Sequence, residues 1–162
     1  MHAHLKTPSP ARALSQDLNK QLPYSLTAER QCQRRVELEE DAICYIPSKP
    51  LLLLYKTKAA RDRAYDLKTK GTIIEPAKAE RLRGKVTKDR VDMIALLDPN
   101  PRKYVTTESF DIDAFYGLVE RFKLEFTLAT ITELPKYRES IRLYNSDLNA
   151  KQIQEWVKTI VE

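Results

Sequence analysis

Lysine and arginine are the residue types whose spacing in this sequence most clearly indicates a chemistry. Residues 78–90 carry six of them against two acidic residues, Glu80 and Asp89. Uncompensated cations attract polyanions, and phosphate backbones bind them through the release of counterions. Two further cations and a tyrosine, on whose ring a base can stack, follow the sequence DPNP. The predicted nucleic-acid-binding residues are therefore Lys78, Arg81, Arg83, Lys85, Lys88, Arg90, Arg102, Lys103 and Tyr104.

Two other interpretations of this basic region stay open. It can be the solvated side of a helix, which is common on small proteins, or a docking surface for an acidic protein. The helix expected from residue 57 makes a useful contrast, because Lys58, Asp62, Asp66 and Lys70 follow at steps of four. Such residues lie on one side of a helix and compensate one another, so that side needs no ligand.

Most catalytic chemistry has no residues to support it in the expected folded body. Both histidines, His2 and His4, lie near the N-terminus, which leaves no imidazole elsewhere for general base catalysis. Cys32 and Cys44 match no zinc-ligand spacing, and they are expected to be buried free thiols in a reducing compartment. The three glycines are far apart, which excludes phosphate-binding glycine loops. We therefore expect a non-enzyme without metal or cofactor.

One enzymatic alternative remains, and it rests on carboxylates. Asp66, Glu75 and Lys78 approximate the acid, acid, lysine order of metal-dependent nucleases, in which carboxylates hold Mg²⁺ and the lysine assists the attacking water. The spacing from Glu75 to Lys78 is one residue longer than usual. A nuclease is therefore the weakest of the alternatives.

The totals are typical of one folded domain. The chain has 162 residues and a net charge of +5, and its excess of positive charge lies within residues 50–106. No apolar run is longer than that at residues 51–55, which is too short to span a bilayer, so no membrane partner is expected. We expect a flexible N-terminal arm over 1–26, a single domain over 27–162 and a cytoplasmic location.

The spacing of apolar residues, together with the positions of proline and glycine, predicts the helices and strands that carry the basic region. We expect a helix over 27–40, strands at 42–47 and 51–55, a helix over 57–70 and a strand at 72–75, of which the last three form a right-handed βαβ unit. Pro76 and Pro99 then bracket a helix in which Lys78, Arg81, Lys85 and Lys88 share one flank. A competing interpretation ends this helix near Gly84 and makes 90–97 a strand.

The C-terminal third is expected to be mostly helical. Strands are predicted at 103–107 and 126–131, and helices are predicted after Asp111, Pro135 and Asn149. The fold class is therefore α+β: a helix-rich single domain with a small mixed sheet and an extended N-terminal arm.

The function that follows is non-catalytic. We expect a nucleic-acid-binding accessory protein, or a small subunit of a nucleoprotein complex, that contacts the RNA or DNA backbone. Protein partners are expected at the N-terminal arm or the C-terminal helix. The principal alternative is a protein-binding adaptor or inhibitor that binds no nucleic acid.

Overall fold

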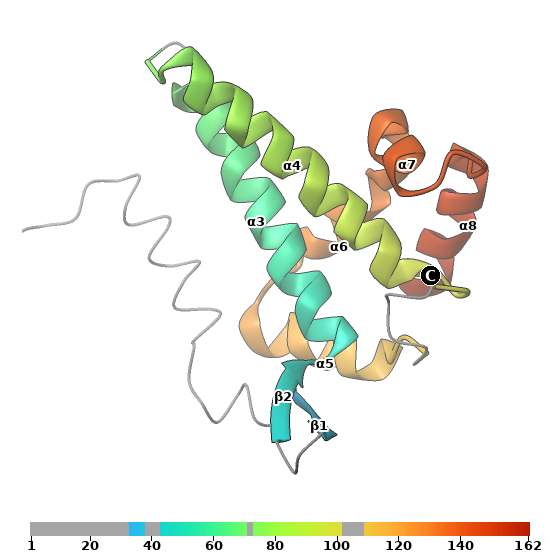
Figure 1. The fold of residues 1–162 in the computed structure, drawn as a ribbon. Helices are drawn as coiled ribbons and strands as arrows, with labels where there is room; N and C mark the ends of the chain where they lie inside the picture. The colour runs from blue at the N-terminus through green and yellow to red at the C-terminus, as the bar shows by residue number, and fades with distance from the viewer. Residues whose placement is uncertain (1–32, 38–42, 71–72, 102–108) are drawn as a thin grey trace, which may run out of the picture.

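The computed structural model describes residues 33–37, 43–70, 73–101 and 109–162, and these residues are rich in helix (Figure 1). Two short strands come first, and all the later elements are helical. In chain order the elements are β1 (Gln33–Glu37), β2 (Ile43–Pro47), α3 (Lys49–Lys70), α4 (Pro76–Leu97), α5 (Ile112–Phe122), α6 (Phe126–Thr132), the 3₁₀ helix η2 (Leu134–Lys136), α7 (Arg138–Tyr144) and α8 (Ala150–Val161).

The two longest helices, α3 and α4, form a hairpin that dominates the fold. Each has 22 residues, which corresponds to about 33 Å of helix. They lie side by side, and the end of the hairpin that carries the turn projects beyond the other helices (Figure 1). Helices α5 and α6 pack on α3, and α7 and α8 pack on α4. Most residues in the first half of α4, at the projecting end, are exposed.

Apolar side chains from all these helices meet in one core. Phe115 of α5 is fully buried, as are Leu53 and Leu54 of α3 and Met93 and Ile94 of α4. Deleting such side chains costs several kcal/mol, so this core fixes the base of the hairpin. The apolar side of α8 is buried as well, with its residues Ile153, Val157 and Ile160. A partner at α8 would therefore meet the polar side of this helix.

Helix caps confirm several of the predicted boundaries. The Asp111 side chain accepts a hydrogen bond from the Ala114 N–H at 2.9 Å, and this cap begins α5. Asn149 accepts from two backbone N–H groups of α8, and the Gln152 side chain accepts from the Asn149 N–H in return. Pro76 stands at the first turn of α4, which runs without interruption to Leu97. The interpretation of 90–97 as a strand is therefore wrong.

The predicted βαβ unit is also wrong. Residues 51–55 form the first turns of α3 rather than a strand, because Pro50 fits the first turn of a helix and the Ser48 hydroxyl accepts from the Leu51 N–H at 3.4 Å. Ile73 and Ile74 lie in the turn between α3 and α4. With two of its three elements absent, the unit does not exist.

Two other predicted elements have the opposite type in the structure. Residues 126–131, expected to be a strand, belong to the helix α6, where Thr127 and Ile131 are buried in the interior. Residues 33–37 of the helix expected over 27–40 form β1, which pairs with the correctly predicted β2. In both places tertiary packing or pairing outweighs local propensity.

The small mixed sheet is not confirmed, because the strands of the described residues form a single antiparallel pair. The predicted arm over 1–26 and the strand at 103–107 lie outside the described residues. No helix in the described ranges is both long enough and apolar enough to cross a membrane.

Candidate nucleic-acid interface

Four of the predicted residues, Lys78, Arg81, Lys85 and Lys88, form a basic stripe on the outer side of α4. Spacings of three, four and three residues put these side chains on one flank of the helix. All four residues are exposed. Because α4 is helical over this whole stretch, the stripe is continuous.

None of the four cations is neutralised by a neighbour among the described residues. Within the part of the chain that the structure describes, no ion pair or side-chain hydrogen bond engages any of them. The charge of +4 along this flank is therefore available to an external anion.

The acidic residues of α4 explain why the stripe stays uncompensated. Asp89 is only 4% exposed and points toward α3, where it pairs with Arg63 and, at 3.7 Å, with Lys56. Asp92 also pairs with Lys56, at 2.6 Å between Nζ and Oδ2. These carboxylates pair with cations of α3, so they do not pair with the four cations of the stripe.

The other two cations of α4 are engaged within the protein. The Arg83 guanidinium pairs with Glu80 at 3.2 Å. The Arg90 guanidinium lies 3.5 Å from the centre of the Tyr137 ring, a cation–π contact, and this residue is half-buried. Both differ from the stripe in having partners, although the sequence pattern grouped all six cations in one set. Arg102, Lys103 and Tyr104 lie outside the described residues.

Helix α3 behaves as its sequence predicts. Lys58 pairs with Asp62 at 2.6 Å, and Lys70 pairs with Asp66 at 2.8 Å. The hydrogen bond and the negative charge of Asp66 raise the pKa of Lys70 above its ordinary value. This side of α3 therefore has little free charge.

The carboxylate set of the nuclease alternative gains no support. Asp66 is engaged by Lys70, and Glu75 precedes the first residue of α4 without a side-chain capping bond. In the described ranges no three His, Cys, Asp or Glu side chains gather closely enough to hold a metal ion.

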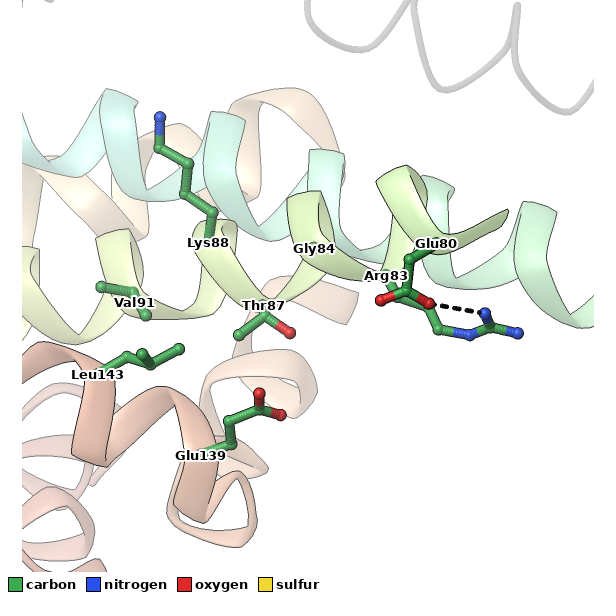
Figure 2. A pocket seen from close by; sticks show the side chains of 8 residues that line it. All are labelled: Glu80, Arg83, Gly84, Thr87, Lys88, Val91, Glu139 and Leu143. Carbon is green, nitrogen blue, oxygen red and sulfur yellow. Dashed lines mark hydrogen bonds and ion pairs between the residues drawn. The ribbon is translucent and has the colours of Figure 1, made fainter. Parts of the chain in front are cut away.

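A shallow groove of about 460 Å³ lies between α4 and α7. Thr87 and Val91 of α4 face Glu139 and Leu143 of α7 across it (Figure 2). The Lys88 side chain leaves the same part of α4 but projects away from α7 (Figure 2). Lys88 is itself one of the residues that line the groove, so the groove and the stripe adjoin at this residue.

The pairing of Asp89 and Asp92 with cations of α3 is the feature that sequence reasoning missed. In the sequence pattern Asp89 is a counter-charge of the basic region. Its position was the available signal, because it falls between Val86 and Met93 in the apolar seam of α4. A carboxylate in a seam position requires a cation from the facing helix.

Comparison with known proteins gives no relative. No protein-family model, curated protein or solved structure matches this chain.

Proposed function

We propose that this protein is a non-catalytic nucleic-acid-binding accessory protein, or a small subunit of a nucleoprotein complex, that binds the RNA or DNA backbone through the basic stripe of α4. We also propose that it acts in the cytoplasm. One observation carries the proposal: four exposed cations share a flank of one helix without a described partner, while the acidic residues Asp89 and Asp92 are turned to the facing helix.

Counterion release supplies the binding free energy in this proposal. Each phosphate neutralised by a Lys or Arg releases condensed counterions, and the observed affinity falls as salt rises. Four such contacts on duplex DNA correspond to a slope of about −3.6 in a plot of log affinity against log salt. Lysine and arginine side chains that contact phosphates carry no base information, so affinity is expected to be similar for unrelated sequences.

The direct test measures binding of the full chain to two generic duplexes of unrelated sequence between about 50 and 200 mM salt. We expect binding to both, with equal affinities and a slope near −3.6. Fluorescence anisotropy of labelled duplexes gives both quantities. A slope near zero, or no binding at the lowest salt to the duplexes or to their separated strands, would contradict the proposal.

The α4–α7 groove favours one alternative, a protein-binding adaptor or inhibitor. Leu143 at its edge is 64% exposed, and Val91 beside it is half-buried. If nucleic acid does not bind, this groove becomes the place at which a protein partner would be sought.

A further inference from the structure

We infer that the ligand of the basic stripe is a double-stranded nucleic acid whose phosphates are held without any reading of the bases. This inference rests on the proposed function and narrows it. Three features of the hairpin carry it: the rigid row of charges, the position of α3 beside that row, and the location of the aromatic rings.

The stripe is a rigid row whose length matches a rigid row of phosphates. From Lys78 to Lys88 it spans about 15 Å of helix axis. Along a duplex axis that length covers roughly four phosphates of one strand, which follow at about 3.4 Å. Because α4 packs on α3 and α7, the backbone positions of the four cations are set before binding. A duplex is stiff as well, so neither backbone loses much conformational entropy.

Helix α3 prevents the stripe from entering a groove. Asp92 follows Lys88 by four residues on the same flank and pairs with Lys56 of α3 at 2.6 Å, so the stripe runs alongside α3. Two packed helices are about 20 Å wide, whereas the major groove of B-DNA is about 12 Å wide. The stripe therefore meets the backbone ridges, and the base edges stay out of its reach.

Single strands need aromatic platforms, and the described tyrosines do not provide one beside the stripe. Tyr65 on α3 is 50% exposed. Arg63, two residues earlier, points to α4, and two residues correspond to about 200° around a helix. The Tyr65 side chain therefore points away from α4. The Tyr116 hydroxyl donates to the Ile160 carbonyl at 2.9 Å, and the Tyr137 ring is covered by Arg90. None of these three rings is therefore placed for a base to stack on it next to the phosphates.

The salt dependence of binding and the free energy of base stacking decide between a duplex and a single strand as the ligand. The salt slope per contact is about −0.9 for duplex DNA and about −0.7 for single strands, because the duplex has the higher charge density. Over four contacts this difference favours the duplex about tenfold at ~50 mM salt and about fourfold at ~200 mM. A single base stacked on an aromatic ring adds about 1–3 kcal/mol and would cancel or reverse that preference.

The test compares the full chain on duplexes of about 20 base pairs, as DNA and as RNA, with the separated unstructured strands. We expect the duplexes to bind about tenfold more tightly at ~50 mM salt, with a smaller preference at higher salt. Tyr65→Ala is the matched control, and it should leave both affinities unchanged. Binding to only one of the two duplex types would still support this inference and would assign the ligand to that type.

Equal or tighter binding of the single strands would overturn this inference and leave the proposed function standing. Loss of single-strand binding in Tyr65→Ala would also overturn it, because that ring would then be a stacking platform. Absence of binding to all four ligands would overturn the proposed function and this inference together.

Discussion

Replacing Lys78, Arg81, Lys85 and Lys88 together by Gln is expected to weaken nucleic-acid binding by at least about a hundredfold at ~50 mM salt. The plot of log affinity against log salt should flatten by about 3–4 units, roughly one for each phosphate that is no longer neutralised. Folding should be spared, because all four residues are exposed and form no ion pair with any described residue. Anisotropy titrations and a thermal melt measure the two effects.

A control variant with the same reduction in net charge distinguishes the effect of the stripe from the effect of the total charge. Lys70, Lys136, Lys151 and Lys158 are exposed residues outside α4, and three of them pair with carboxylates of their own segments. Their joint replacement by Gln should change the affinity and the slope far less. Equal effects from the two sets would mean that only overall charge matters.

The second large effect concerns the hairpin itself. Replacing Asp89 by Ala leaves Arg63 without its carboxylate and Lys56 with Asp92 alone. Breaking a buried ion pair costs about 3–5 kcal/mol, and the partial exposure of Arg63 and Lys56 puts this case near 3 kcal/mol. For a chain of this length the melting temperature should fall by about 6–12 °C.

Asp92→Ala is the matched control, since Asp92 lies on the same helix and pairs with the same lysine but is 32% exposed in its side chain. This replacement should cost less than about 1 kcal/mol. If the two variants melt at the same temperature, the buried carboxylate does not hold the hairpin. Under conditions where Asp89→Ala is still folded, its binding to nucleic acid should not weaken, because Asp89 faces α3 and not the ligand.

The helix that carries the site could be predicted from sequence because its signals are local. Pro76 and Pro99 bracket it, and Ala79, Val86 and Met93 recur at helical spacing, so the flank of the cations followed directly. The cations that pair with Asp89 could not be read from α4 alone. They are Arg63 and Lys56, which a different helix supplies from 26 and 33 positions earlier in the chain.

The errors in the fold come from short apolar runs. Leu51 to Leu54 have no periodicity, and over so few residues a buried strand and a buried helix look alike. Ser48 and Pro50 were the better evidence, because a cap and a first-turn proline indicate a helix start. Residues 126–131 are rich in β-branched side chains, yet the packing of Thr127 and Ile131 makes them helical.

The most direct measurement of the central claim is lysine footprinting of the full chain with an amine-reactive reagent, with and without a bound duplex. Mass spectrometry reports the modification rate at each lysine. The proposed interface predicts slower modification at Lys78, Lys85 and Lys88 when duplex is bound, and unchanged rates at Lys136, Lys151 and Lys158. Protection of the second group, with the α4 lysines still reactive in the complex, would contradict the account.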